Sequence, residues 1–265
     1  MLSIVIPARD EAGSIAESIT GIVTKLRAER IDYEIVVVDD GSRDDTRECV
    51  LALAGPGSGI RLVENRGRHG FGMAVRAGLP QCTGDAVVVM MADLSDSPTD
   101  LVTYYRKFEE TGHCVFGSRF VRGGQVVGYP AHKRVINRLA NWFIKVIFGL
   151  RYNDVTNAFK CYTREAVDHM QPLISPHFNL TVEMPLKAIV RGFPFEVVPI
   201  TWTNRKAGVS KLKIKEMGSR YLFIALYLWL EKMLSRGDYK RPDRQGEAHL
   251  DAPGETVVKA GADHV

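Results

Sequence analysis

Hydrophobic and polar positions alternate in blocks over the first 120 residues, and the blocks predict strands and helices in turn. Short, β-branched apolar runs end in polar or glycine-rich segments, as expected for strands buried on both faces of a parallel sheet. A capping box at Ser14–Glu17 and an N-cap with a first-turn proline at Ser97–Pro98 predict two helix starts. We expect strands at residues 2–6, 33–38, 60–63, 85–90 and 115–117, and helices beginning near 14, 44, 74 and 97.

This alternation of strands and helices predicts βαβ units, hence an α/β fold with a mostly parallel sheet. The second half of the chain differs. It contains a basic and apolar helical stretch at 132–150, a late strand at 195–202, a basic loop at 204–215 and an apolar helix at 221–234. We expect one α/β domain over residues 1–215, an interfacial or core helix at 216–235, and a polar, disordered tail at 236–265.

Composition narrows the class of protein without changing this fold prediction. The 265 residues are 45% hydrophobic with a net charge of +4, which is ordinary for a globular protein. The first hundred residues show no basic stripe of the kind that binds nucleic acid. The four cysteines form no CxxC pair, which argues against a zinc site or a disulfide framework and favours a reducing compartment. The N-terminus reads as a buried strand instead of a signal peptide, and the longest apolar run, 221–230, is shorter than the roughly 20 residues of a membrane span. We therefore expect a cytoplasmic protein.

Carboxylates follow two of the predicted strands, at the edge where open α/β sheets bind ligands. Asp39 and Asp40 end one strand and could accept hydrogen bonds from a nucleobase or a ribose; the alternative is that this segment only caps a helix. Asp93 follows the next buried strand and could hold Mg²⁺ or Mn²⁺ beside a diphosphate. Asp96 is either a further metal ligand or the cap of the helix that follows.

Two glycine-containing basic segments could bind phosphate. Residues 67–72 precede a helix whose first N–H groups suit an anion, although glycines also make plain turns and His69 reads as structural. Residues 205–211 form a basic loop that could close over a diphosphate and neutralise the leaving nucleotide, or could be only a solvated surface.

Taken in order, these segments resemble glycosyltransferase family 2, and within it the dolichol-phosphate mannosyltransferase branch. The resemblance runs from about residue 1 to 215 and rests on Pro7-Ala8-Arg9-Asp10-Glu11, Val37-Val38-Asp39-Asp40-Gly41-Ser42, Gly70-Phe71-Gly72-Met73-Ala74, Gly117-Ser118-Arg119, Asn137-Arg138, Asp154-Val155-Thr156-Asn157-Ala158-Phe159-Lys160, and the spacing of Arg205 and Lys211.

That resemblance implies a GT-A fold, a nucleotide-diphosphate sugar (GDP- or UDP-linked) as donor, Mg²⁺ or Mn²⁺ as cofactor and a polyprenyl phosphate as acceptor. The nucleotide sugar would be bound by Pro7, Arg9, Glu11, Val38, Asp39, Asp40, Arg68, Met91 and Ala92. The metal would be held by Asp93, Ser95 and Asp96, and the acceptor phosphate by Lys133, Asn137 and Arg138. Asp93, Arg119, Arg205 and Lys211 would be the catalytic groups.

One departure from the family pattern concerns the metal. Met91 stands where the family has the first Asp of Asp-x-Asp, and a thioether is a poor ligand for a hard cation. Metal affinity could therefore be weaker, Asp96 could compensate, or catalysis could be lost. The reaction we expect is an inverting, direct displacement on the anomeric carbon that relies on positioning and on cations instead of a strong base.

Several alternatives remain open at this stage. The acceptor could be another lipid or a glycan, or the chain could be a non-catalytic GT-A domain in which Met91 marks lost turnover; a nucleotidyltransferase is less favoured because Pro7–Ser14 is not a glycine-rich basic loop. The segments 142–150 and 221–234, apolar and flanked by Lys and Arg, suit peripheral binding to a membrane surface. The alternative is that both segments pack in the core or in a dimer interface; a homo-oligomer or a membrane partner protein is also possible.

Overall fold

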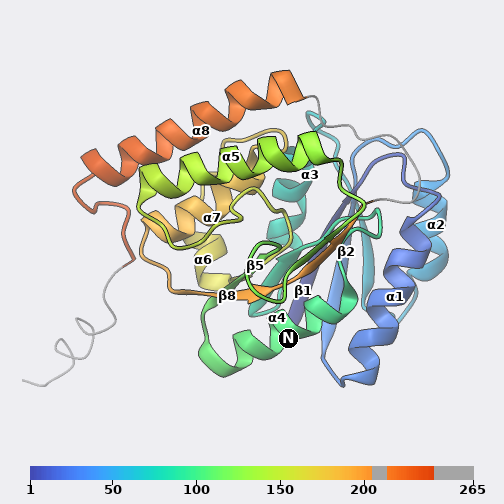
Figure 1. Cartoon of the computed structure of the whole chain (residues 1–265). Helices are drawn as coiled ribbons and strands as arrows, with labels where there is room; N and C mark the ends of the chain where they lie inside the picture. The colour runs from blue at the N-terminus through green and yellow to red at the C-terminus, as the bar shows by residue number, and fades with distance from the viewer. Residues whose placement is uncertain (205–213, 242–265) are drawn as a thin grey trace, which may run out of the picture.

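Seven strands form the central sheet of the computed structural model, which describes residues 1–204 and 214–241 (Figure 1). Their order across the sheet is β3-β2-β1-β4-β7-β5-β8, and every neighbouring pair is parallel except the two that involve β7. The strands are β1 Leu2–Ala8, β2 Tyr33–Asp39, β3 Ile60–Glu64, β4 Ala86–Val89, β5 Cys114–Ser118, β7 Lys160–Thr163 and β8 Phe195–Pro199. The predicted α/β class with a mostly parallel sheet is confirmed.

Helices cover both faces of the sheet because the side chains of its central strands alternate between two cores. Ile4 and Ile6 of β1 pack in one core with α1 (Ile15–Ala28), α2 (Thr46–Leu53) and α4 (Pro98–Thr111). Val5, between them in sequence, belongs to the other core, which α3 (Phe71–Gly78), α6 (Arg164–His169) and α7 (Leu180–Val190) complete. A short 3₁₀ turn, Leu79–Gln81, leads from α3 to β4.

Two long helices, α5 (Ala131–Phe148) and α8 (Ile214–Leu234), lie beyond α7 and contact one another (Figure 1). Buried ion pairing fixes α8 to the body, since Arg191 Nε at the end of α7 donates to Glu231 Oε1 at 2.9 Å. Lys232 Nζ donates to the Phe148 carbonyl at 2.7 Å and so ties α8 to the end of α5. The apolar helix predicted at 221–234 therefore begins earlier than expected and is packed against the domain.

A small parallel sheet of two strands, β6 (Gln125–Val127) and β9 (Thr201–Thr203), stands apart from the main sheet. The single strand expected at 195–202 is therefore wrong: β8 pairs with β5 as far as Pro199, and the chain then turns into β9. Ile200 N–H still donates to the Ser118 carbonyl at 3.2 Å, and its own carbonyl accepts from Gln125 N–H at 2.9 Å, so Ile200 is where the chain passes from one sheet to the other.

Two further expectations need correction. Ser14 precedes α1 without a side-chain capping bond, because its hydroxyl donates to Glu11 instead, so no capping box forms there. Residues 236–241, expected to be disordered, are packed on the body, where Arg241 Nε donates to Glu165 Oε1 at 2.6 Å. The remainder of that segment, 242–265, lies outside the described residues.

Candidate active site

The loops that follow β1 and β2 are joined by hydrogen bonds at the carboxyl edge of the sheet. Glu11 N–H donates to Thr46 Oγ1 at 2.8 Å and Arg43 N–H donates to Asp10 Oδ1 at 2.8 Å. Asp39 Oδ1 accepts both the N–H of Ser42 at 3.0 Å and its hydroxyl at 2.5 Å. These bonds hold the two loops in one arrangement before any ligand binds.

Asp40 is the centre of a second network, which holds the glycine-rich segment in place. Its Oδ1 accepts from Asn65 Nδ2 at 2.6 Å and faces His69 Nδ1 at 3.2 Å, while its Oδ2 accepts the Gly70 N–H at 2.8 Å. Arg9 Nη1 lies 4.0 Å from the same carboxylate. Asp40 therefore positions the loop beside it in addition to presenting negative charge, a role that the sequence did not predict.

The expected metal segment, residues 91–96, forms a tight turn with both carboxylates buried. Asp93 Oδ1 accepts the Ser95 N–H at 3.1 Å, and Asp96 Oδ2 accepts the Met91 N–H at 2.9 Å. Asp93 is 7% exposed and Asp96 is 6% exposed. Burial raises the pKa of the Asp96 carboxyl to about 7; the Met91 N–H opposes this shift and the neighbouring Asp93 carboxylate adds to it.

The donor set at 91–96 suits a divalent cation that also binds substrate oxygens. Both carboxylates and Ser95 line one cavity, and hard cations such as Mg²⁺ use one or two carboxylates with substrate phosphates and water. Met91 contributes only its thioether to the same wall. Among the described residues no three His, Cys, Asp or Glu side chains converge as in a site built by protein alone. Two carboxylates and one hydroxyl in this wall are thus the side chains that could hold a divalent cation.

Arg119 is fixed by a buried carboxylate. Asp154, fully buried, accepts from the backbone N–H of Arg119 at 2.9 Å, from its Nε at 2.8 Å and from its Nη2 at 2.6 Å. Burial by itself lowers the pKa of the guanidinium, but the Asp154 carboxylate outweighs that effect and the net pKa is raised. Gly117 precedes this pair where a Cβ would lie 1.9 Å from the Tyr104 hydroxyl, which explains the glycine of Gly117-Ser118-Arg119.

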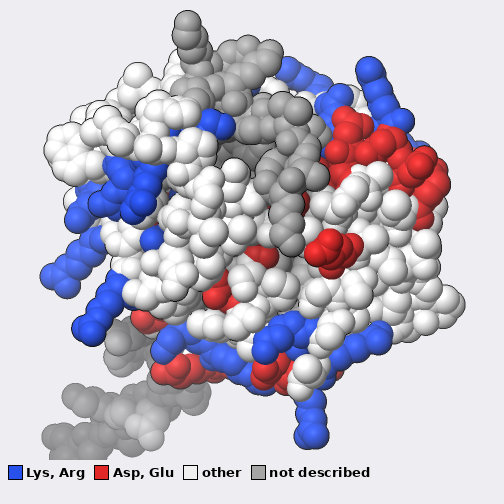
Figure 2. Space-filling model, turned by 45° about the vertical axis from the view of Figure 1, so that its right-hand side comes forward, with Lys and Arg blue, Asp and Glu red and all other residues white. Residues whose placement is uncertain are grey.

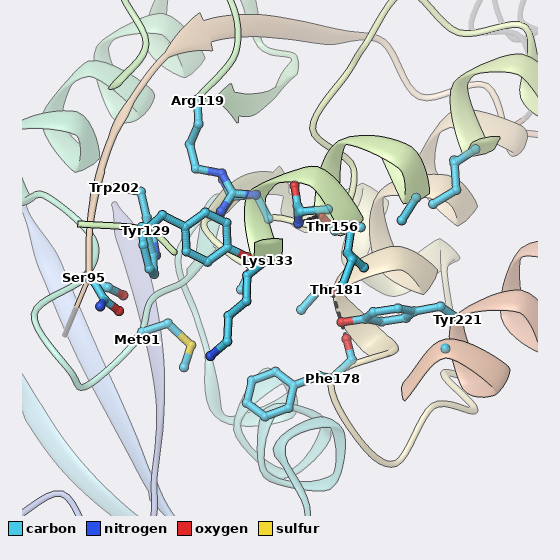
Figure 3. A pocket seen from close by; sticks show the side chains of 18 of the residues that line it. Met91, Ser95, Arg119, Tyr129, Lys133, Thr156, Phe178, Thr181, Trp202 and Tyr221 are labelled. Carbon is cyan, nitrogen blue, oxygen red and sulfur yellow. Dashed lines mark hydrogen bonds between the residues drawn. The ribbon is translucent and has the colours of Figure 1, made fainter. Parts of the chain in front are cut away.

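A cavity of about 590 Å³ joins these groups to the two outer helices (Figure 3). Its polar end holds Asp93, Asp96 and Arg119, and its other walls come from α5, α7 and α8. Figure 3 shows the Lys133 side chain extending into the space between Met91 and Phe178. The apolar side chains in the walls of α5 and α8 are Ile136, Ala140, Phe143, Ile144, Leu222 and Ala225.

Asn137 and Thr156 connect α5 to the loop that carries Asp154. Asn137 Nδ2 donates to Thr156 Oγ1 at 2.8 Å, and the buried Asn141 donates to the same hydroxyl at 2.9 Å. Asn137 and Thr156 both line the cavity, whereas Arg138 does not; its guanidinium lies 4.7 Å from the centre of the Phe120 ring. Of the three residues expected at an acceptor phosphate, the structure brings Lys133 and Asn137 into the cavity.

The outer faces of α5 and α8 expose an unusual amount of apolar surface. Six large apolar side chains on α5 and seven on α8 are between 37% and 71% exposed: Val135, Ile136, Leu139, Trp142, Phe143, Val146, Leu222, Phe223, Leu226, Tyr227, Leu230, Met233 and Leu234. We call these thirteen residues the apolar face. Helix α5 also carries four basic residues and no acidic one. In Figure 2 basic side chains lie at the left and, mixed with acidic ones, along the lower edge, while the largest acidic group is at the upper right.

None of the helices within the described residues is long and apolar enough to cross a bilayer. Single exposed apolar residues are normal on soluble proteins, but contiguous patches of this extent mark contact with another molecule or with a membrane.

The remaining predicted residues fall in several places. Pro7 and Val38 are register partners with buried side chains, so only their backbones are presented there. Ala92 is buried in the turn, and Arg68 is exposed. Arg205 and Lys211 lie outside the described residues. The sequence reading missed Asn65, Tyr129, Trp202 and Tyr221; only contacts between distant segments single them out.

Comparisons with known proteins agree with this geometry. The family model described as glycosyl transferase family 2 matches residues 3–170. The polyprenol monophosphomannose synthase of Mycolicibacterium smegmatis is 31% identical over 216 residues, 79% of this chain and 80% of that protein. The dolichol-phosphate mannosyltransferase of Pyrococcus furiosus is 29% identical over 219 residues, 81% of this chain but only 60% of that protein.

Solved structures show the same fold at lower sequence identity. Glucosyl-3-phosphoglycerate synthase from Mycobacterium tuberculosis, solved with Mn²⁺, UDP and phosphoglyceric acid, superposes with a TM-score of 0.64 over 92% of this chain and 80% of that one, at 20% identity. The same enzyme with Mn²⁺, UDP and glucosyl-3-phosphoglycerate gives 0.62. The expected GT-A fold is confirmed.

Proposed function

This chain belongs to glycosyltransferase family 2, and from that premise we propose that it transfers a hexose from a nucleotide-diphosphate sugar to a polyprenyl phosphate at a membrane surface. The names of the two relatives favour mannose as the sugar. The cavity is the observation that carries the proposal: cations and carboxylates stand at one end, and apolar walls of α5 and α8 stand at the other. Such a cavity suits an acceptor with a charged head and a hydrocarbon chain.

The donor would bind along the edge of β1, β2 and β4. In this proposal the nucleoside of the GDP- or UDP-linked donor contacts Pro7, Arg9, Glu11, Val38, Asp39, Asp40 and Arg68. Its diphosphate lies at Met91 and Ala92. Asp93 and Asp96, with Ser95, would hold Mg²⁺ or Mn²⁺, which supplies positive charge to the leaving diphosphate. The observed network supports this placement because it holds the edge rigid, as a preorganised polar site requires.

The reaction we propose is a single inverting displacement. An oxygen of the acceptor phosphate attacks the anomeric carbon and forms the new C–O bond, while the bond from that carbon to the donor diphosphate breaks and the nucleoside diphosphate leaves with the electron pair. An acceptor phosphate is already ionised near neutral pH, so no strong general base is needed. Lys133 and Asn137 would position the acceptor, whereas Arg138 lies outside the cavity against the Phe120 ring. Arg119, Arg205 and Lys211 would stabilise charge on the phosphates.

Peripheral membrane binding is the second part of the proposal. The apolar face, with basic residues along α5, has the composition of helices that lie in the interface of an anionic bilayer. Both helices also line the cavity, and Ile136, Phe143 and Leu222 belong to the lining and to the apolar face alike, so a lipid acceptor could reach the cavity from the membrane surface. We place the protein on the cytoplasmic side, consistent with its reduced, scattered cysteines.

The deciding experiment measures transfer of labelled hexose to polyprenyl phosphate in detergent. The donors are GDP-mannose, GDP-glucose, UDP-mannose and UDP-glucose, each tested with Mg²⁺, with Mn²⁺ or with a chelator. We expect product from one donor class, only with metal, and only when the acceptor carries its phosphate. Polyprenol without phosphate is the matched control. Transfer to a glycan or a lipid without a polyprenyl phosphate, and none to polyprenyl phosphate itself, would contradict the proposal.

A further inference from the structure

Trp202 stands at the junction of the two ends of the cavity. It lies in β9, and the backbone fixes it to the carboxylate segment: Thr203 N–H donates to the Ser95 carbonyl at 3.1 Å, and Asp96 and Trp202 form an isolated β-bridge. On its other side β9 pairs with β6, with Trp202 opposite Val126. The indole is thus held at a fixed place relative to Asp93 and Asp96.

The indole has aromatic and cationic neighbours and faces the cavity. The Tyr129 ring meets it edge-on at a centroid distance of 5.0 Å, and the Arg119 guanidinium carbon lies 6.0 Å from its centroid. Trp202 is only partly buried and lines the same cavity as Asp93 and Lys133. Figure 3 shows Trp202 and Tyr129 next to one another, with Ser95 on one side of the pair and Lys133 on the other.

We propose that the Trp202 ring is the surface against which the transferred hexose lies, with Tyr129 supporting its orientation. The inference rests on the proposed function. In a direct displacement the anomeric carbon must sit between the donor diphosphate and the acceptor phosphate, hence between Asp93 and Asp96 on one side and Arg119 and Lys133 on the other. The indole lies in the wall beside that interval, because its backbone is bridged to Asp96 and the Arg119 guanidinium carbon is 6.0 Å from its ring centroid.

The chemistry of both partners supports this assignment. A hexopyranose presents C–H groups on a face and hydroxyls on its rim, and an aromatic ring buries such a face without demanding hydrogen bonds from it. Neighbouring polar groups remain available to the rim hydroxyls. Trp202 would then act by orienting the sugar, and no proton transfer is assigned to it.

Tryptophan emission offers a direct test because the chain has only three tryptophans. Trp142→Phe with Trp229→Phe leaves Trp202 as the sole indole; neither replaced residue lines the cavity. The probes are GDP-mannose and UDP-glucose, each compared with GDP or UDP alone, in Mg²⁺ or Mn²⁺. We expect the nucleotide sugar to cut acrylamide quenching of Trp202 at least twofold, and the nucleotide diphosphate alone to change it little.

Calorimetry on the same protein separates the two proposals. If a nucleotide sugar binds but quenching of Trp202 is the same with and without the sugar, the Trp202 assignment is overturned and the proposed function stands. If neither nucleotide nor nucleotide sugar binds with metal, both are overturned.

Kinetics provide a second readout. Trp202→Leu should raise the donor KM about tenfold while the Kd of the nucleotide diphosphate stays within twofold, and Trp202→Phe should recover most of the loss. Trp229→Phe, outside the cavity, is the matched control and should leave both constants unchanged. Equal weakening of nucleotide and nucleotide-sugar binding by Trp202→Leu would show a structural role and refute the assignment.

Discussion

The two ends of the cavity are built by different forces. At the strand edge, the turn after β4 places two buried carboxylates in the cavity wall, and their oxygens are already bound by backbone N–H groups: Asp93 accepts from Ser95 and Asp96 accepts from Met91. At the helix side, α5 and α8 present aliphatic and aromatic surface that the described residues leave uncovered. One end is therefore complete without a partner, whereas the other has the composition of a surface that is buried only on binding. The predictions below test this contrast.

The largest expected effect is at the strand edge. Asp93→Asn should lower turnover by about 10²–10³-fold, because a charge that stabilises the metal–diphosphate complex is lost while the packing stays nearly the same. Metal-dependent nucleotide binding, measured by calorimetry, should weaken in parallel. Asp85→Asn is the matched control: its carboxylate is exposed at the opposite end of β4 and pairs with the N-terminal amine. An active Asp93→Asn enzyme that still requires metal would exclude Asp93 as a ligand.

Asp154→Asn should reduce turnover by roughly 10²-fold and destabilise the protein by about 3–5 kcal/mol, since it leaves the buried Arg119 guanidinium without its charged partner. Urea unfolding and kcat measure the two effects. Arg119→Met should be similarly inactive. The double variant should lose less free energy of unfolding than the two single variants lose in total. Fully additive losses would mean that the pair does not act as a unit.

The features that could be predicted from the sequence are those with a local signal. Apolar runs ending in carboxylates are local signals, so the strands, the class of fold and the positions of Asp40 and Asp93 could be predicted. Strand β7 could not: it is four residues long, begins with a buried lysine and runs antiparallel between β4 and β5. The position of Trp202 in the cavity wall could not be predicted either, because only the pairing of β9 with a distant segment brings it there.

On the helix side, removing apolar surface should weaken membrane binding and spare the chemistry. Leu139→Glu combined with Phe223→Glu should lower co-sedimentation with anionic phospholipid vesicles by at least about tenfold, because two side chains that are 60% and 62% exposed can no longer enter the bilayer. Leu51→Glu places the same charge on a side chain that is 48% exposed on α2, away from this face, and should bind as wild type does. Binding that survives the double change would argue for a protein partner or a dimer at the apolar face.

Lys133→Ala should raise the KM for polyprenyl phosphate about tenfold and leave the donor Kd unchanged, because its amine reaches into the cavity from α5 (Figure 3). His132→Ala, the exposed neighbour in sequence, is the control. An equal rise in the acceptor KM and in the donor Kd would place Lys133 at the donor and would contradict separate roles for the two ends of the cavity.

The smallest effect concerns the loop where the two ends meet. Lys160 Nζ, fully buried, donates to the Val155 carbonyl at 3.0 Å and also to the Asn157 carbonyl, so it holds the loop that carries Asp154 and Thr156. Burial lowers the pKa of Lys160 to about 7, against the opposing effect of Asp154. The unfolded chain keeps this amine protonated up to about pH 10, so between pH 7 and 10 it binds more protons than the folded protein.

Stability contributed by this group should therefore rise with pH across that window. From pH 7 to pH 8 the gain is about 1 kcal/mol in the free energy of unfolding. Lys160→Met removes the titrating amine, so the difference in unfolding free energy between wild type and Lys160→Met should grow by that amount over the same interval, as measured by urea unfolding. A difference that does not change with pH would mean that Lys160 stays charged in the folded protein, and that the loop joining the two ends is held by a full positive charge.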